Sequence, residues 1–539
     1  MLDSPTNNFA VCNPLTDSGN RSVKSEGNLR STSAHGAWQH SPSSISMSAG
    51  KWYSEMLLNT AGEGIAIYAC VTDATDTTAV KFDSNNKLVG YKRQSGNKVI
   101  NGTVSSYGAG YNAGDIIGMA LDMDAKTLTF YKNNASQGTI SSIPYVNAYF
   151  DAVVTDNASV TFNFGQDSSF AGNKTPQGNQ DSNGIGDFYY QPPSGFLSLC
   201  TKSLPSVDVI PSENFNTVLY TGTGNSNAVS NLGLTPDFTW IKSRSNTEGH
   251  GLVDSVRGAT KLLSSNTTDS EATSANYVAS LDSDGFTVGT STLTNGNGYT
   301  YVAWNWKAGG SASSNSNGSV TSQVSANVEA GFSIATFTLP TTATTIGHGL
   351  SKPPELIFQK GRVSGSAWWT FVKPIGNTKA LRLDTTTNAV TSSNFWNNTD
   401  PTSTLVTIGA NSGGNNSWLM YCFHSVENYS KVGSYVGNGS ATAGPFVHCG
   451  FKPAFVLIKR SNAAQDWYLW DTKRSPINPV AATLSPNSNG AEGDRSSLPT
   501  DVLSNGFKIR NTSIGWNGNG DTYIFYAIAE SPFKNSNAH

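Results

Sequence analysis

The chain has 539 residues, and its 34 Lys and Arg residues against 37 Asp and Glu residues leave a formal net charge of −3. This balance excludes a strongly basic protein of the kind that binds nucleic acid, and no apolar run approaches the roughly 18–20 residues that a membrane-spanning helix needs. Only 13% of the residues are charged, whereas Gly and Asn contribute 53 residues each. The composition disfavours solvated helices and favours short strands joined by Gly, Asn and Ser turns, so we predict an all-β chain.

The length suits about three to five domains of roughly 100–200 residues each. Disorder is excluded, because 37% of the residues are hydrophobic, 12 Trp among them, and can fill several cores. The cysteines are odd in number, widely spaced and without a Cys-x-x-Cys pair, so we interpret them as small buried hydrophobic residues. They are Cys12, Cys70, Cys200, Cys422 and Cys449.

The first domain is predicted at residues 40–171, after a lead-in or attachment segment at 1–39. Residues 114–133 contain two alternating strands that flank an Asp-Ala-Lys turn, which predicts a hairpin. Asp122 and Asp124 bracket this turn. They lack the further carboxylates and the glycine of a calcium-binding loop, so we interpret them as turn residues.

This hairpin resembles the SPRY family, whose pattern has a Gly-Asp entry, a Gly in the first strand, Leu-Asp before the turn and Leu-x-Phe-x-x-Asn after it. The matching residues are Gly114, Asp115, Gly118, Leu121, Asp122, Leu128, Phe130 and Asn133. The strand that begins Lys51-Trp52-Tyr53 and the stretch 160–165 fit the same family. The resemblance implies a bent sandwich of two antiparallel sheets that binds partners through its loops and carries no catalytic residues.

The rest of the chain repeats itself three times. Each copy has a Gly, a large apolar residue, a short polar step that ends in Pro, and then a strand with apolar residues at positions +2 and +4 and Lys at +6. The final prolines are Pro236, Pro354 and Pro453; the apolar pairs are Phe238 and Trp240, Leu356 and Phe358, and Phe455 and Leu457; the lysines are Lys242, Lys360 and Lys459. A second aromatic strand follows, with Trp304, Tyr421 and Tyr526 placed 68, 67 and 73 residues after the Pro.

A period near 100 residues is typical of self-contained small sandwiches and too long for a solenoid. We therefore predict three mutually similar β domains, with one linker before the first copy and a Gly/Ser-rich linker before the second. The domains are 208–310, 328–430 and 431–535, and the linkers are 172–207 and 311–327. The flexible second linker predicts a hinge after the first copy, and the abutting second and third copies predict a rigid pair.

The repeated lysines suggest either a sugar- or phosphate-binding set or a structural role. We favour the structural role, in which each stem runs over the rim of the core and the ammonium group reaches solvent or an acid of the same domain. Asp254 and Asp471, each twelve residues after its Lys, are candidates for that acid, whereas the middle copy has Val372 at this offset.

Most Trp residues recur at strand positions and are predicted to lie in the core. Trp396 and Trp516 instead have polar, turn-forming neighbours, as in Gly515-Trp516-Asn517-Gly518. We therefore predict that these two are exposed and bind ligand, although Trp residues in loops also cap the ends of sandwiches.

The sequence contains no His-Glu-x-x-His pattern, nucleophile elbow, phosphate-binding loop or dinucleotide fingerprint. His448 and Cys449 are adjacent and would point to opposite faces of a strand. No motif singles out a carboxylate pair for glycoside cleavage. We predict that the chain is not an enzyme and uses no cofactor or metal.

A SPRY-like domain followed by Trp-rich repeats resembles the virion structural proteins of tailed bacteriophages, in particular tail-fibre-like or adhesin-like proteins of marine phages. The resemblance implies a tail protein that is assembled in the host cytoplasm, forms a homo-oligomer, contacts other virion proteins and binds a glycan or protein receptor on the host. It implies neither nucleic-acid binding nor membrane insertion. The alternatives are a decorating component of the capsid or tail without a receptor role and, less favoured, a polysaccharide depolymerase.

Overall fold

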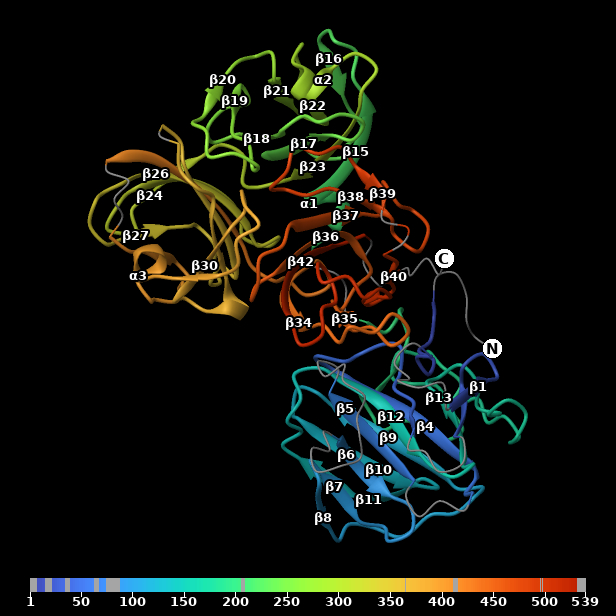
Figure 1. The fold of residues 1–539 in the computed structure, drawn as a ribbon. Helices are drawn as coiled ribbons and strands as arrows, with labels where there is room; N and C mark the ends of the chain where they lie inside the picture. The colour runs from blue at the N-terminus through green and yellow to red at the C-terminus, as the bar shows by residue number, and fades with distance from the viewer. Residues whose placement is uncertain are drawn as a thin grey trace. The chain divides into compact units, whose positions relative to one another are not determined.

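The computed structural model describes residues 7–14, 22–33, 39–62, 67–73, 88–204, 209–363, 365–410, 415–494, 496 and 498–530. The chain divides into two compact units (Figure 1). Unit 1 lies within Met1–Ser206 and unit 2 is Val207–Pro532. Antiparallel strands dominate both units and helices are short, which confirms the predicted all-β fold.

Unit 1 is built from two antiparallel sheets. The larger sheet has the order β1-β2-β13-β4-β9-β10-β11, and β14 adds to β4 in parallel. Its strands are β1 (Ser22–Ser25), β2 (Arg30–Ser33), β4 (Lys51–Thr60), β9 (Ile116–Asp122), β10 (Thr127–Lys132), β11 (Ala135–Ser141), β13 (Ser159–Asn163) and β14 (Leu197–Ser198). The smaller sheet has the order β3-β12-β5-β6-β7-β8. Its strands are β3 (Gln39–His40), β5 (Tyr68–Asp73), β6 (Leu88–Lys92), β7 (Lys98–Ile100), β8 (Thr103–Ser105) and β12 (Ala148–Val154).

The predicted hairpin is formed by β9 and β10, which pair from Asp122↔Thr127 onward. One oxygen of the Asp122 carboxylate accepts the backbone N–H of Asp124 at 3.0 Å and that of Ala125 at 2.8 Å. The turn interpretation of this acid is therefore confirmed, because the carboxylate is used to hold the turn.

Segments on both sides of the predicted domain join its sheets. Strands β1 and β2 come from the predicted lead-in, of which residues 1–6, 15–21 and 34–38 lie outside the described part, and β14 comes from the predicted linker 172–207. The linker is also held by the carboxylate of Glu55 on β4. This carboxylate is fully buried and accepts the N–H groups of Tyr189 at 2.9 Å and Tyr190 at 2.7 Å.

Unit 2 contains the three repeats, and the first and third have the same topology. In repeat 1 the main sheet has the order β15-β23-β17-β18, with a second sheet β16-β22-β21 and a small hairpin β19-β20. The strands are β15 (Phe215–Thr221), β16 (Asn227–Val229), β17 (Phe238–Ser243), β18 (His250–Asp254), β19 (Lys261–Leu262), β20 (Ala272–Thr273), β21 (Val278–Asp282), β22 (Gly285–Val288) and β23 (Thr300–Trp306). The helices are α1 (Pro211–Asn214) and α2 (Thr292–Asn295).

Repeat 3 matches repeat 1 strand for strand, with the orders β34-β42-β36-β37, β35-β41-β40 and β38-β39. Its strands are β34 (Ser430–Val436), β35 (Phe446–His448), β36 (Pro453–Arg460), β37 (Trp467–Asp471), β38 (Ala482–Thr483), β39 (Gly493–Asp494), β40 (Thr500–Leu503), β41 (Gly506–Ile509) and β42 (Thr522–Ala529).

Repeat 2 has an extended main sheet, β24-β25-β26-β33-β28-β29-β30-β31, opposite the pair β27-β32. Its strands are β24 (Ser313–Asn315), β25 (Ser322–Asn327), β26 (Phe332–Leu339), β27 (Thr344–Gly347), β28 (Leu356–Gly361), β29 (Trp369–Val372), β30 (Lys379–Arg382), β31 (Val390–Thr391), β32 (Leu405–Ile408) and β33 (Asn416–Phe423). The helices are η1 (Lys373–Ile375) and α3 (Ser393–Trp396).

The segment 311–327 differs from the flexible spacer that we expected. It supplies β24 and β25, and β25 pairs along β26 from Ser322↔Phe337 to Asn327↔Phe332. Its Ser, Asn and Gly content is typical of a linker, but its backbone groups are used in a sheet. The expected hinge after repeat 1 is therefore wrong.

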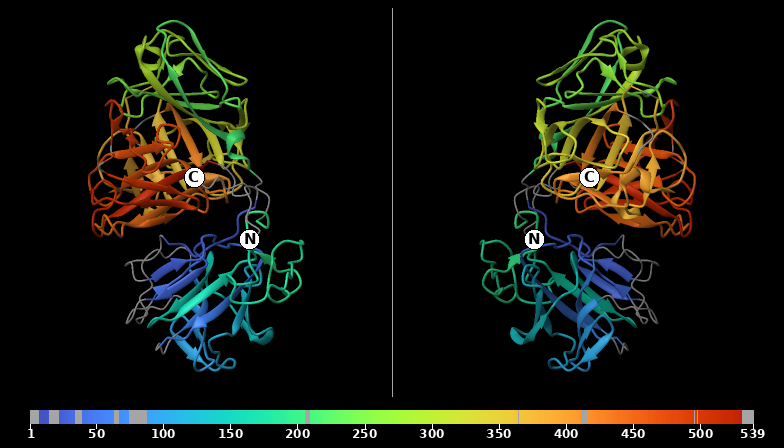
Figure 2. Two further views of the ribbon diagram at one scale, coloured as in Figure 1. Left: turned by 90° about the vertical axis from the view of Figure 1, so that its right-hand side faces the viewer. Right: turned by 90° about the vertical axis from the view of Figure 1, so that its left-hand side faces the viewer.

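The three repeats share one apolar core. The residues at positions +2 and +4 of each copy are buried in a single cluster with the aromatic residues of the second strand, so the main sheets face one another across this cluster. Phe238, for example, stacks on Tyr421 of repeat 2 with ring centroids 4.2 Å apart, and Trp304 meets Phe455 of repeat 3 at 6.1 Å. Figures 1 and 2 show the green, yellow-orange and red parts of unit 2 lying next to one another.

Equivalent hydrogen bonds connect the repeats in a closed ring. His250 Nε2 of repeat 1 lies 3.1 Å from the carbonyl oxygen of Ser485 in repeat 3. Trp368 Nε1 of repeat 2 donates to the carbonyl of Ser264 in repeat 1 at 2.8 Å. Trp467 Nε1 of repeat 3 donates to the carbonyl of Arg382 in repeat 2, also at 2.8 Å. Each repeat therefore docks on the one before it, and the first docks on the last.

Glu55 predicts a pH dependence for unit 1. Burial raises the pKa of its carboxyl group from 4.5 to about 7, although the N–H groups of Tyr189 and Tyr190 oppose this change. The unfolded chain then releases this proton at a lower pH than the folded chain does. The contribution of Glu55 to stability is therefore fully present below pH 4.5 and is lost as the pH rises through 7.

We expect the free energy of local opening around β4, measured by amide hydrogen exchange, to fall by roughly 3 kcal/mol more in the wild type than in Glu55→Gln between pH 4.5 and pH 8. The Gln side chain does not titrate in this range. Equal pH profiles for the two proteins would contradict the assignment.

Candidate functional site

Both tryptophans that we predicted to be exposed are buried. Trp396, at the end of α3, is 1% exposed, and its Nε1 donates to the carbonyl of Lys379 at 3.1 Å. Trp516 is 0% exposed and packs against Tyr468, with ring centroids 5.5 Å apart. The expected exposure is wrong because both indoles pack against strand residues of their own repeats, Trp396 against Phe371 and Trp516 against Tyr468. Their role in ligand binding stays a prediction that their burial does not support.

The repeated lysines lie at the junctions between the repeats. Lys360 Nζ donates to the carbonyl oxygens of Thr268 and Asp269 in repeat 1, at 3.2 and 2.9 Å, and Lys459 Nζ donates to that of Thr386 in repeat 2, at 2.8 Å. Lys242 bonds carbonyl oxygens of its own repeat. Burial lowers the pKa of all three ammonium groups to about 8. The lysines are structural, but the expected contact with solvent or with Asp254 and Asp471 is wrong.

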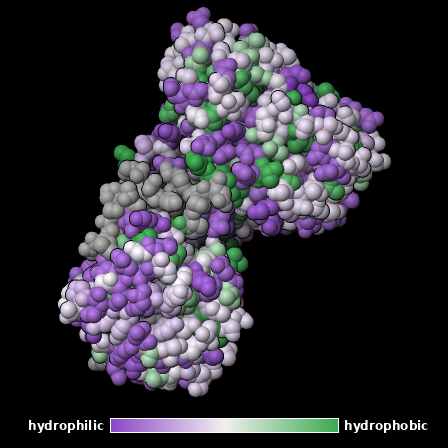
Figure 3. All heavy atoms as spheres, turned by 180° about the vertical axis from the view of Figure 1, so that it is seen from behind, coloured by the Kyte–Doolittle hydropathy of each residue, from purple (hydrophilic) through white to green (hydrophobic). Residues whose placement is uncertain are grey.

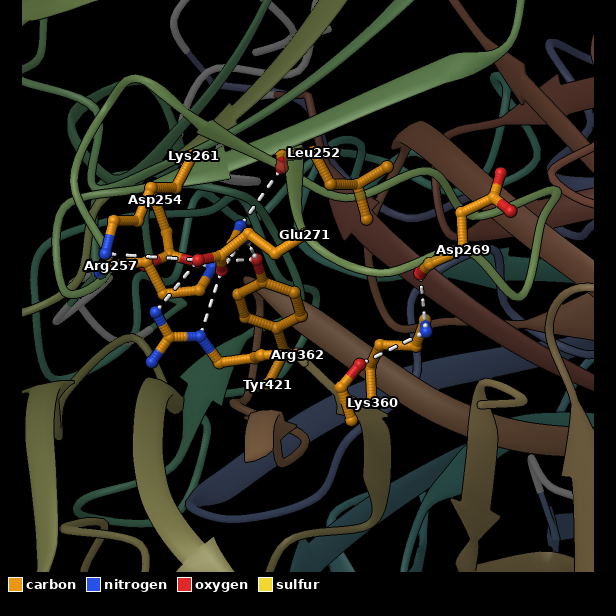
Figure 4. A network of polar contacts seen from close by, with 10 residues as sticks. Leu252, Asp254, Arg257, Lys261, Asp269, Glu271, Lys360, Arg362 and Tyr421 are labelled. Carbon is orange, nitrogen blue, oxygen red and sulfur yellow. Dashed lines mark hydrogen bonds and ion pairs between the residues drawn. The ribbon is translucent and has the colours of Figure 1, made fainter. Parts of the chain in front are cut away.

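Those two acids instead belong to ionic networks that join the repeats. At the junction between repeats 2 and 1, the buried Asp254 carboxylate pairs with Arg257 at 2.6 Å and accepts the hydroxyl of Tyr421 at 2.7 Å (Figure 4). Arg257 also bonds Glu271 at 3.0 Å, and Arg362 of repeat 2 reaches both oxygens of Glu271, at 2.9 and 3.0 Å. Burial raises the pKa of Glu271, but the hydrogen bond from Arg362 and the charge of Arg257 hold it below its ordinary value.

The junction between repeats 1 and 3 repeats this network. Asp471 pairs with Arg474 at 2.6 Å and accepts Nε1 of Trp304 at 3.0 Å. Glu492 bonds Arg474 at 3.0 Å and Arg244 of repeat 1 at 2.9 and 2.8 Å. The two junctions therefore have the same acids and arginines at equivalent positions.

The third junction, between repeats 3 and 2, has lost every one of these charges. The equivalent residues are Val372, Ile375, Ala389 and Ser461. Val372 and Ile375 belong to or pack against the shared core. The backbone contact is retained, since the N–H of Ala389 donates to the carbonyl of Ser461 at 3.0 Å, as Glu271 does to Arg362 at 2.8 Å. Uncharged residues thus replace the ionic network at this junction, and the backbone hydrogen bond is kept.

Two outer loops are held by buried asparagines and form the candidate recognition site. In repeat 1, the side chain of Asn295 accepts the N–H of Thr223 at 2.8 Å and donates to the carbonyl of Gly289 at 2.6 Å. In repeat 3, the side chain of Asn517 accepts the N–H of Asn438 at 2.7 Å and donates to the carbonyl of Ser440 at 2.9 Å.

The loops that these asparagines hold, residues 222–226 and 437–443, are uncharged and largely exposed. We missed them in the sequence. A signal was present, since Asn-Gly-Asn-Gly occurs at 295–298 and again at 517–520. These hydrogen bonds clamp part of each loop's backbone and leave its exposed polar groups available for contact.

Two histidines of unit 2, His250 and His348, are buried. Burial lowers the pKa of His250 to about 3 and that of His348 to about 4, which makes both imidazoles neutral and poor proton donors. Among these residues, no three or more His, Cys, Asp or Glu side chains are placed to hold a metal ion. The described helices include none with the length and apolarity to span a membrane.

Comparison with known proteins defines the class of each unit. Residues 51–167 of unit 1 match the SPRY domain family, so the predicted SPRY domain is confirmed. The solved SPRY domain of human HERC1 is similar over 26% of this chain and 91% of its own, at 17% sequence identity and a TM-score of 0.23. The PSpry domain of TRIM65 covers 29% of this chain and 92% of its own at 15% identity and a TM-score of 0.23. Stonustoxin covers 29% of this chain and 27% of its own at 18% identity and a TM-score of 0.24.

Residues 210–532, which make up almost all of unit 2, match the family described as a domain of unknown function, DUF7483. The chain belongs to this family. No curated protein matches it in sequence.

Substitution of Glu271 tests whether the ionic network between repeats 1 and 2 stabilises the fold. In Glu271→Ala we expect a loss of about 2–4 kcal/mol in the free energy of unfolding, because Arg257 stays buried without this partner. Lys373→Ala, which removes an exposed ion pair with Glu355, should cost less than about 1 kcal/mol. Urea denaturation followed by tryptophan fluorescence measures both. Equal losses for the two variants would contradict a structural role for the network.

Substitution of Asn517 tests whether its side-chain hydrogen bonds hold the loop at residues 437–443. Asn517→Ala should accelerate amide exchange at Asn438 by about 5- to 150-fold, since each lost buried hydrogen bond costs about 1–3 kcal/mol. Asn519→Ala, an exposed residue of the same Asn-Gly-Asn-Gly stretch, is the matched control and should leave exchange unchanged. An unchanged rate at Asn438 in both variants would show that the loop is held by other contacts.

Proposed function

We propose that this chain is a structural protein of a bacteriophage virion, a tail fibre or adhesin component that binds the host cell surface through loops of its β-sandwich domains. It acts without catalysis, a cofactor or a metal. Its partners are a glycan or protein receptor on the host and other proteins of the tail. We further propose that it forms a homo-oligomer and is assembled in the host cytoplasm.

The observation that carries this proposal is the contrast between the junctions and the outer loops of unit 2. The junctions use Asp254, Arg257 and Glu271, with their equivalents in repeat 3, to hold the repeats together. The clamped loops at 222–226 and 437–443 carry only Gly, Thr, Asn, Ser and Ala. A rigid frame with uncharged polar loops suits recognition, because little conformational entropy is lost when the loops bind.

The surface supports the same proposal. On the face shown in Figure 3, hydrophilic and weakly hydropathic residues predominate in each unit, and hydrophobic residues are scattered among them. The exposed large hydrophobic residues lie far apart in sequence, as with Val104, Ile477 and Ile514. Such a surface favours polar contacts to glycans or proteins over burial in a membrane.

An adsorption assay tests the proposal. Excess purified chain, added to host cells before the phage, should reduce adsorption by at least about tenfold if receptor sites are limiting. A chain that carries both Asn295→Ala and Asn517→Ala should compete less well, whereas Asn519→Ala should compete as the wild type does. Undiminished adsorption in the presence of bound chain would contradict the receptor role.

Two further outcomes would redirect the proposal to its alternatives. Placement of the chain on the capsid lattice by cryo-electron microscopy of the particle would favour a decorating protein. Release of reducing ends from host envelope glycans by the purified chain would favour a polysaccharide depolymerase.

A further inference from the structure

The outer edge of β15 is the feature that the preceding roles leave unexplained. In the sheet order β15-β23-β17-β18, β15 is the terminal strand and pairs on one side only. An edge strand presents a row of backbone N–H and C=O groups to which another strand can bind.

The register shows which groups face outward. The N–H of Gly222 donates to the carbonyl of Tyr299, and the N–H of Lys307 donates to that of Asn214, so the even-numbered residues of this stretch bond β23. Because strands alternate, the backbone groups of Thr217 and Leu219 point away from β23. No described residue bonds them, and the buried hydroxyl of Thr217 has no hydrogen-bond partner in this part of the chain either.

The equivalent edge in repeat 2 is occupied. Phe215 of β15 pairs with Trp306, and Phe332 of β26 pairs with Phe423 at the same position of its sheet, so Thr217 and Leu219 correspond to Ile334 and Thr336. In repeat 2 these residues pair with Ser325 and Gln323 of β25. The ring of repeats does not block the position, because β25 occupies it within the same ring.

The equivalent edge in repeat 3 is partly closed. The outward N–H of Ser430 donates to the carbonyl of Val426 at 2.9 Å, and that of Val432 donates to the hydroxyl of Ser425 at 3.0 Å. Strand β34 also carries Lys431 and Gly433. A charge and a glycine are common means of keeping an edge strand unpaired.

Strand β15 shares only one of these features, since the N–H of Phe215, the residue equivalent to Ser430, donates to the carbonyl of Pro211. Its sequence, Phe-Asn-Thr-Val-Leu-Tyr-Thr, has no charge, no Pro and no Gly. It also has a high proportion of β-branched and aromatic residues, which favour strand pairing. Of the three equivalent edges, it is thus the one best suited to pairing, with Leu219 38% exposed and Thr217 6% exposed.

We propose that the outer edge of β15 binds an extended, uncharged polar segment of a separate protein chain, which pairs antiparallel to β15 as β25 pairs to β26. The template for the bound strand is β25 itself, Ser-Gln-Val-Ser-Ala-Asn. Main-chain hydrogen bonds to Thr217 and Leu219 supply the affinity. Every second residue of the bound strand is small and packs against the main sheet of repeat 1. This proposal stands on the sheet edge and is independent of the virion role.

A labelled peptide with the sequence of residues 318–328 is the probe, and its binding to the intact chain is measured by fluorescence anisotropy. Leu219→Pro should weaken binding at least about tenfold, because Pro removes an outward N–H and leaves the bonds to β23 intact. Ser434→Pro, at the equivalent outward position of β34, is the matched control and should leave binding unchanged.

Amide hydrogen exchange gives a second readout on the intact chain. The amides of Thr217 and Leu219 should exchange faster than those of Ile334 and Thr336, and the peptide should slow them. Absence of peptide binding, equal weakening by both Pro variants, or protection of Leu219 in the free chain would overturn the proposal. So would a dimer of the chain that Leu219→Pro dissociates, since the edge would then bind a second copy.

Discussion

The packing of three sheets against one shared aromatic core is the constraint on which unit 2 depends. Each main sheet is buried on both faces, with one face in its own sandwich and the other in the centre of the ring. Ile241 lies in the core of repeat 1, whereas its neighbour Trp240 lies in the shared core. Strands buried on both faces need continuous apolar sequences, which explains runs such as Phe455-Val456-Leu457-Ile458.

The shared core determines which polar groups can be buried around it. Because the repeats exclude water from their junctions, each charge there needs a partner, and two junctions meet this need with the same Asp, Arg and Glu constellation. The third junction has Val372, Ile375 and Ala389 in place of these charges, and its remaining ammonium group, that of Lys459, donates to the carbonyl of Thr386. Both solutions keep the same backbone contact, so this hydrogen bond does not depend on the ionic groups. Burial of ion pairs brings little net stability, but removal of one partner is costly.

The same frame separates the parts of the chain that are available for recognition from those that are not. Aromatic residues, buried lysines and most acids of the repeats are used internally. The outward-facing parts include the small polar residues of the loops held by Asn295 and Asn517, and the edge of β15, where Leu219 has no described backbone partner. In unit 1 the buried carboxylate of Glu55 also holds a loop in place, since it binds the segment after the SPRY domain to β4.

The sequence by itself determined the all-β class, the SPRY hairpin and the threefold repeat, because alternation, turn residues and constant spacing are local properties of the chain. It also showed apolar residues at equivalent strand positions, among them Phe238, Leu356 and Phe455. It could not show that these residues face other repeats, because a buried strand has the same pattern whether its second face meets its own domain or another. For the same reason it misplaced Trp396 and Trp516, whose polar neighbours resemble an exposed loop, and it took 311–327 for a spacer. Only the tertiary structure decided these points, since burial and pairing depend on surfaces that are distant in sequence and meet in the ring.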